Sequence, residues 1–431
     1  MTERTLQVDY LARVEGEGAL RVRIHDRTVE EVELKIFEPP RFFEAFLRGR
    51  SYEEAPDITA RICGICPVAY QMSACHAIER GLKLTVSPEV RALRRLLYCG
   101  EWIESHALHV YLLHLPDFLG YPDAIRLAKD RPEVVQQGLA LKRAGNELMT
   151  VLGGREIHPI NVRIGGFYRC PAREELEEIR TRLESALHLA EETVRLAAGL
   201  SFPNVEEDYE FVSLRHPLEY PMNEGEVVSN RGLRIPQTRY EEEFQELQVP
   251  YSHALHSVRR GGGSYLVGPL ARYALNRDRL GPKADAIVRE VGLEPVVRNP
   301  FRSVIVRAVE MVEACDQALQ IIGQYRPPAR PYLEATPPFA SNDCMAITEA
   351  PRGMLYHRYR LDAAGLIEEA RIVAPTSQNQ KRIEDDVRDV VERSLDLPDE
   401  SLTHECERAI RNHDPCISCA THFLSLDLVR E

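Results

Sequence analysis

The segment RICGICP, residues 61–67, carries two cysteines in a CxxC pattern directly before a proline. A second such pair lies almost the whole chain away, in DPCISCATH at residues 414–422. Four thiolates around one ion are typical of zinc, iron–sulfur or other soft-metal sites. Zinc modules usually keep their pairs within about 12–20 residues of each other. The wide separation therefore predicts that the whole chain closes around one buried metal centre.

Two other interpretations of the cysteine pairs stay open at this point. Structural zinc is the commonest use of paired CxxC motifs. A redox-active CxxC needs only one pair, in a βαβ context that this sequence does not show. The other cysteines show no iron–sulfur spacing and are expected to be packing residues: Cys75, Cys99, Cys170, Cys315, Cys344 and Cys406.

The composition predicts a soluble, cytoplasmic protein. A formal net charge of −13 over 431 residues argues against a nucleic-acid partner. No apolar run reaches the roughly 18 residues that a membrane span requires. The start, MTERTLQVDY, lacks the basic and apolar regions of a secretory signal. Ten cysteines are too few for a disulfide scaffold in a chain of this length.

Hydrophobic periodicity predicts an α+β fold that is mostly helical. Partial alternation predicts N-terminal strands at 6–12, 19–26 and 29–37, and a later strand pair at 353–362 and 366–375. Apolar residues at helical spacing predict the long helices that make up the rest of the core, at 67–82, 88–115, 134–152, 172–200, 303–324, 380–394 and 401–412.

Further motifs lie in order between the two cysteine pairs and the chain ends. They are RVEGEG (13–18), EPPRFFEAFLRGR (38–50), SHALH (105–109), GGREIHPINVRIGG (153–166), SYLVGPLAR (264–272), EAPRG (349–353) and APTSQN (374–379). Together with RxCGxC and DPCxxCxxH, they resemble the large, catalytic subunit of nickel–iron hydrogenases. The sequence is most similar to the cytoplasmic NAD(P)-linked branch, which includes the sulfhydrogenase alpha subunits.

The resemblance implies a ligand set for the metal centre. Cys63 and Cys416 would be terminal nickel ligands, and Cys66 and Cys419 would bridge nickel to an iron that carries carbon monoxide and cyanide. Soft thiolates suit both metals. The implied reaction is the reversible heterolytic cleavage of dihydrogen, with Cys416 as the expected proton acceptor.

The resemblance also implies two catalytic residues outside the cysteine motifs. Glu15, in RVEGEG, matches a carboxylate that relays protons beside the terminal cysteine. Glu17 stands where many family members have histidine, so the contacts beside Glu15 are expected to differ. Arg352, in EAPRG, matches an arginine above the metal site, where a permanent positive charge polarises dihydrogen or stabilises an anionic centre.

A second, hard metal ion is implied near the end of the chain. Glu44, His422 and the backbone carbonyl of Ile372 match ligands of magnesium or another divalent ion, which prefers oxygen donors. Four other histidines in matching motifs are expected only to support the site: His76, His106, His109 and His158.

The resemblance implies partners and processing as well. Because the chain has no iron–sulfur motif, a small iron–sulfur subunit is expected to accept the electrons. In this branch, further flavin and iron–sulfur subunits would transfer them to NAD(P). Residues 1–422 would form one catalytic body on a helix-bundle core, with a β-rich section at 1–50. A maturation protease would remove 423–431.

Two related proteins of other function share this fold. A regulatory hydrogen-sensing or scaffold subunit would keep the four cysteines, and the C-terminal extension favours the enzyme over it. The quinone-site subunit of respiratory complex I lacks the cysteines and is excluded.

Overall fold

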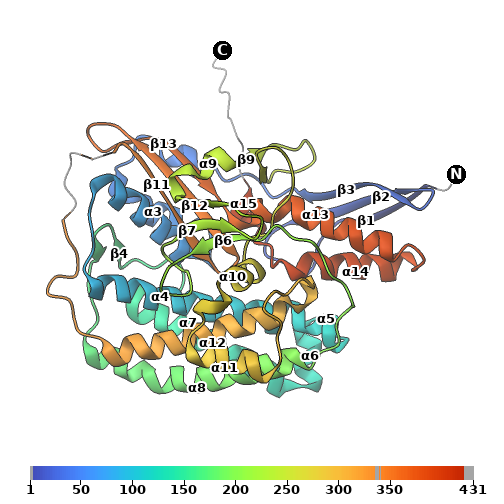
Figure 1. Cartoon of the computed structure of the whole chain (residues 1–431), viewed down its shortest axis with the longest axis horizontal. Coiled ribbons are helices and arrows are strands. Elements are labelled where there is room, and N and C mark those ends of the chain that lie inside the picture. Colours follow the sequence, from blue (N-terminus) through green and yellow to red (C-terminus); the bar gives the residue numbers. More distant parts are fainter. Residues whose placement is uncertain (1–2, 335–338, 340, 422–431) are drawn as a thin grey trace, which may run out of the picture.

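The N-terminal section forms an antiparallel sheet of β1 Glu3–Val8, β2 Gly18–His25 and β3 Thr28–Ile36 that extends from one end of the molecule (Figure 1). The computed structural model describes residues 3–334, 339 and 341–421. Side chains of β2 alternate between buried and half-buried, as expected for a sheet with one covered face. Apolar residues of this sheet pack against α13 Pro375–Arg393 and α14 Asp399–Asn412.

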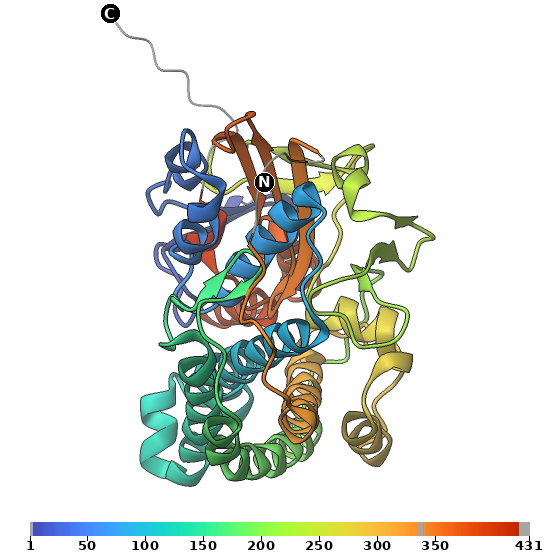
Figure 2. The ribbon, with the colours of Figure 1, turned by 90° about the vertical axis from the view of Figure 1, so that its left-hand side faces the viewer.

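Long helices form the other half of the molecule (Figures 1 and 2). α4 Pro88–Ala107 packs against α7 Pro132–Gly153 and α12 Ser303–Gln324, and α12 packs against α8 Arg173–Ala198. α4 is buried along most of its length. α8 turns glutamate and arginine side chains to solvent. The predicted α+β class with mostly helical content is confirmed.

The helix predicted at 88–115 is interrupted. α4 ends at Ala107, a π-helical turn covers Leu108–His114, and α5 follows at Leu115–Leu119. Residues five apart share a face only where the helix widens in this way. His109 Nε2 and His114 Nε2 consequently both reach the end of α14, each at 2.8 Å, on the Arg411 carbonyl oxygen and Asn412 Oδ1.

A second antiparallel sheet lies next to the helices, in the order β11 Asp343–Ala350, β12 Gly353–Leu361 and β13 Ile367–Val373. α3 Pro67–Leu82 packs on β11 and β12. The predicted pair at 353–362 and 366–375 is confirmed as β12 and β13, whereas β11 was not predicted. Most of β11 is buried on both faces, so it lacks the alternation that identifies a strand.

The remaining elements are short and connect these layers. The helices are α1 Phe43–Leu47, α2 Ala55–Ala60, α6 Ala124–Asp130, α9 Tyr240–Glu243, α10 Pro269–Asn276, α11 Pro282–Glu290 and α15 Ile417–Ala420. The strands are β4 Val162–Arg163, β5 Gly166–Phe167, β6 Val212–Arg215, β7 Glu226–Ser229, β8 Arg234–Ile235, β9 Phe244–Leu247 and β10 His256–Arg259. Across the described part of the chain, no helix is long and apolar enough to cross a membrane.

Candidate metal centre

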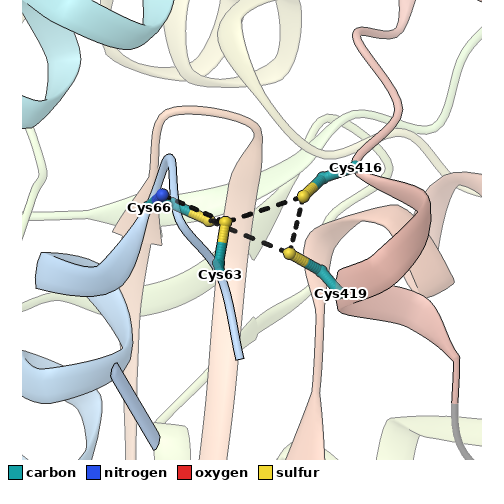
Figure 3. Close-up of side chains that lie close together, drawn as sticks. All are labelled: Cys63, Cys66, Cys416 and Cys419. Atoms are coloured by element: carbon teal, nitrogen blue, oxygen red, sulfur yellow. Dashed lines mark hydrogen bonds between the residues drawn. The ribbon is translucent and has the colours of Figure 1, made fainter. Parts of the chain in front are cut away.

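Four cysteine side chains meet in a buried site between the loop before α3 and the short helix α15 (Figure 3). The Sγ–Sγ distances are 2.8 Å in the pair Cys63/Cys66 and 2.7 Å in the pair Cys416/Cys419. Across the pairs, Cys63 and Cys416 are 3.6 Å apart, and Cys66 and Cys419 are 4.0 Å apart. A metal about 2.3 Å from four tetrahedral sulfurs separates them by about 3.8 Å. The two distances across the pairs are close to this value, and the two distances within the pairs are shorter. Four free thiols within reach of one ion are a donor set that suits soft metals.

The first pair is shaped by the start of α3. Pro67 occupies the first turn of the helix, where a missing N–H costs nothing. The backbone N–H groups of Ile65 and Cys66 donate to Cys63 Sγ at 3.3 and 3.1 Å. Such hydrogen bonds favour a thiolate at Cys63. Gly64, between the two cysteines, is exposed.

The second pair is shaped by the start of α15. Cys416 is the residue before this helix, and its backbone N–H donates to Thr376 Oγ1 at 3.0 Å. Asp414 has a φ of 52°, a left-handed conformation that few non-glycine residues adopt. The chain is thus redirected at Asp414-Pro415, directly after α14.

Without a metal, hydrogen bonds among the four thiols shift the pKa values of the individual cysteines. Burial opposes ionisation, but hydrogen bonds from Cys416 and Cys419 lower the pKa of Cys63 well below its usual value. The hydrogen bond with Cys419 contributes most to raising the pKa of Cys416. A bound metal cation replaces the shared protons and deprotonates its thiol ligands.

Arg352 stands beside the second pair. It lies in the two-residue turn between β11 and β12 and is 3% exposed. Its Nε donates to the Asp414 carbonyl oxygen at 2.8 Å and its Nη2 to Asp414 Oδ1 at 3.1 Å. Burial disfavours the charged guanidinium, but Asp414 and the cysteine sulfurs outweigh burial and raise the pKa of Arg352. The arrangement keeps one positive charge fixed at the sulfur cluster.

Glu15 stands on the other side of α15. Its backbone forms a parallel bridge with Cys416, and its carbonyl oxygen accepts the Ile417 N–H at 2.9 Å. Its carboxylate accepts the Ser418 N–H at 3.1 Å and the Ser418 hydroxyl. The side chain is only half-buried. Glu15 therefore bridges the helix of the second pair and the surface.

The residues expected to bind a hard ion come together next to Cys419. Glu44 Oε1 accepts the Ile372 N–H at 2.7 Å. Both residues line a cavity of about 20 Å³ together with Cys419 and Thr421, and a site for one water needs roughly 10–15 Å³. His422 and the extension 423–431 lie outside the described residues.

The histidines of the motifs have separate surroundings. His106 Nε2 lies 2.9 Å from Glu310 Oε2, and His109 contacts the end of α14. His76 is half-buried, and desolvation lowers the pKa of its imidazole well below the usual value. His158 is half-buried beside Cys63. The supporting role expected for these histidines stays a prediction.

Sequence reasoning missed two residues that hold the cysteine loops. Glu101 of α4 accepts the N–H groups of Val68 at 2.6 Å and Ala69 at 3.2 Å, so a carboxylate from another helix caps α3. Thr376 holds Cys416 from α13. Thr376 lies in the motif APTSQN, which was a usable signal, whereas no sequence pattern connects Glu101 to α3.

The chain belongs to the nickel-dependent hydrogenase family, whose model matches residues 41–137 and 229–422. It is 34% identical to the alpha subunit of sulfhydrogenase 1 from Pyrococcus furiosus, over 98% of each chain. It is 27% identical to the beta subunit of the NAD-reducing hydrogenase of Cupriavidus necator, over 98% of this chain and 95% of that subunit.

Solved structures agree with this assignment. An NAD⁺-reducing [NiFe]-hydrogenase in the H₂-reduced state matches with a TM-score of 0.87 at 27% identity, over 97% of this chain and 99% of that chain. The Ni-Fe-Se hydrogenase of Desulfovibrio vulgaris Hildenborough shares the fold, with a TM-score of 0.79 at 23% identity over 98% and 100% of the two chains. The predicted hydrogenase large subunit is therefore confirmed. The matched relatives are themselves subunits of larger enzymes.

Proposed function

We propose that this chain is the catalytic subunit that cleaves dihydrogen reversibly into protons and electrons, at a nickel–iron centre held by Cys63, Cys66, Cys416 and Cys419. The observation that carries the proposal is the cluster of four buried sulfurs beside a buried arginine. A structural zinc ion is fully coordinated by its four ligands, so a buried charged side chain beside the sulfurs would not be needed there.

The proposed ligand roles follow the two pairs. Cys63 and Cys416 would hold nickel, and Cys66 and Cys419 would be ligands of both nickel and iron. When bound, the nickel–iron centre, with carbon monoxide and cyanide on its iron, supplies the heterolytic cleavage of dihydrogen. Arg352 supplies a fixed positive charge in a site without bulk water, where such a charge acts most strongly.

Protons leave through the second pair. Cys416 Sγ accepts the proton, and the Glu15 carboxylate passes it toward the surface. The proposal is supported by the backbone bridge between Glu15 and Cys416 and by the hydrogen bonds from Ser418. A half-buried carboxylate at this place joins a buried thiolate to solvent.

Electrons leave through the first pair, to an iron–sulfur subunit that docks over it. Gly64 is exposed between the two cysteines, and His158 lies beside Cys63. Ile157 and Ile160, on either side of His158 in the sequence, are 50% and 53% exposed, and we propose that they belong to the docking surface. Two relatives are named as NAD-reducing hydrogenases. We further propose flavin-containing subunits that pass the electrons to NAD(P), and hence a cytoplasmic enzyme.

Elemental analysis of the purified complex, with infrared spectroscopy, tests the proposed centre. We expect one nickel per chain, iron in addition, infrared bands of bound carbon monoxide and cyanide, and dihydrogen-dependent dye reduction. Zinc alone without such bands would contradict the proposal. A loaded centre with no turnover would point to the hydrogen-sensing subunit instead.

We propose a magnesium site in the cavity beside Cys419. β13 is the edge strand of its sheet, and the N–H and C=O of one residue in an antiparallel strand point to the same side. Because the Ile372 N–H points to Glu44, the Ile372 carbonyl points there too. Two oxygen donors therefore face one cavity, with His422 next in sequence after the lining residue Thr421.

Glu44→Gln should empty this proposed site. The amide keeps the size of the side chain but loses its charge, so we expect magnesium content to fall from one per chain to near zero. A bound ion at roughly 100 times its Kd adds about 2.7 kcal/mol of stability. Chelation should therefore lower the unfolding temperature of the wild type and of the exposed control Glu53→Gln, but not of Glu44→Gln. Equal magnesium in all three proteins would refute the site.

A further inference from the structure

A fully buried arginine, Arg272 of α10, lies behind the hairpin turn that carries Arg352. Its Nη1 donates to the Ala350 carbonyl oxygen at 2.8 Å, and its Nη2 donates to the Pro351 carbonyl oxygen at 2.6 Å. These are the last two carbonyl groups before Arg352. Arg272 thus contacts the backbone of the turn directly.

Acidic and aromatic side chains hold Arg272 in turn. Its Nε and Nη2 form a bidentate pair with Glu310 at 2.8 and 2.7 Å, and its Nη1 reaches Glu349 Oε2 at 3.0 Å. The guanidinium lies 4.4 Å from the ring centre of Trp102. The Trp102 Nε1–H donates to the Glu349 carbonyl oxygen at 3.2 Å. Three consecutive carbonyls before Arg352 are therefore bound by residues of the helices.

Every donor of Arg272 is used. An arginine has five N–H donors in a planar fork, and the hydrogen bonds to Glu310, Glu349, Ala350 and Pro351 employ all of them. A lysine offers three donors from one nitrogen and cannot reach two carboxylates and two carbonyls in this geometry. The arrangement depends on arginine and not on positive charge alone.

The start of α10 also closes on the turn. Gly268, the residue before α10, has a φ of 109°, and a Cβ there would lie 2.6 Å from the Arg352 carbonyl oxygen. On its other side, the turn is held by the hydrogen bonds from Arg352 to Asp414. A two-residue turn has few ways to move, so the contacts on both sides set where the Arg352 guanidinium stands.

We propose that Arg272 is a positioning residue: by binding the carbonyls of Ala350 and Pro351, it holds the turn so that Arg352 stays at the sulfur cluster. The consequence for turnover rests on the proposed function, whereas the effect on the turn does not. The Arg272→Lys variant is therefore tested by two independent measurements on the assembled enzyme.

The first measurement is hydrogen–deuterium exchange of the segment 346–356. We expect this segment to exchange about tenfold faster in Arg272→Lys. The control Arg94→Lys breaks an equally buried bidentate pair with Glu79, and it should leave the segment unchanged. Trp102→Phe, which keeps an aromatic ring and loses one hydrogen bond to the turn, should raise the exchange less. Unchanged exchange in both Arg272→Lys and Trp102→Phe would overturn the proposal, and Trp102→Phe decides it if Arg272→Lys does not assemble.

The second measurement is a double-mutant cycle on kcat for dihydrogen oxidation. Arg272→Lys should lower kcat roughly 10–100-fold, as the loss of a supporting partner does, with KM nearly unchanged. In the Arg352→Lys background it should add almost nothing, because the two act as one unit. Losses that multiply would overturn the proposal. Full activity of Arg352→Lys alone would refute the role of Arg352 in the proposed function. The exchange measurement would then still test whether Arg272 holds the turn.

Discussion

Cys416→Ser is expected to abolish dihydrogen turnover. Serine keeps the size of the side chain and its place before α15, but it replaces a soft thiolate with a hard hydroxyl that binds nickel poorly. Loss of a residue that only supports a metal ligand costs about 10–100-fold, so loss of a ligand should exceed that range. We expect at least a thousandfold lower turnover, measured as dihydrogen-dependent dye reduction, with nickel content well below one per chain.

Cys406→Ser is the matched control for this result. Cys406 is a fully buried, free cysteine of α14, ahead of Cys416 in the chain, and it belongs to the apolar cluster that packs under the N-terminal sheet. A buried serine hydroxyl costs about 1–3 kcal/mol of stability but removes no ligand. This variant should unfold earlier and keep its nickel and its turnover. Full turnover in Cys416→Ser, or equal losses in both variants, would contradict the assignment.

Glu15→Gln is expected to lower turnover by about 10²–10⁴-fold, the usual contribution of a positioned proton-transfer group. The glutamine oxygen can still accept the Ser418 N–H, and its amide N–H₂ can donate to the Ser418 hydroxyl oxygen. The backbone bridge to Cys416 should therefore survive. The amide cannot take up the proton. Dye reduction and exchange of dihydrogen with deuterium from solvent should therefore fall together, because both require a proton to move between Cys416 Sγ and water.

Two observations separate this effect from damage to the centre. Nickel and iron content should equal that of the wild type, since Glu15 binds no metal in the proposed site. Glu17→Gln makes the same chemical change at an exposed carboxylate two positions on, and it should keep full exchange and turnover. If Glu15→Gln keeps its deuterium exchange, the proton leaves by another route.

Sequence patterns identified most of the long elements, because the spacing of apolar residues along a long segment shows which of its faces is buried. α3 and α12 have the predicted bounds, and α4 begins at the predicted Pro88. The misses have physical causes. The π-helical turn at Leu108–His114 keeps helical hydrophobicity and is stabilised by contacts with the distant residues Arg411 and Asn412. β11 is buried on both faces and carries no alternation.

The sequence by itself predicted the chemistry of the centre: which thiols would bind a metal, and which charged residues stand in motifs beside them. Such predictions rest on residue types and on the motifs that contain them, and both can be read directly from the sequence. The tertiary structure alone decided how those groups are held. Arg272 and Glu101 act through the backbones of Pro351 and Val68, and a hydrogen bond to a backbone group leaves no residue-type signature at the partner position. Such supports are visible only once the chain has brought pairs 353 residues apart to within 4 Å.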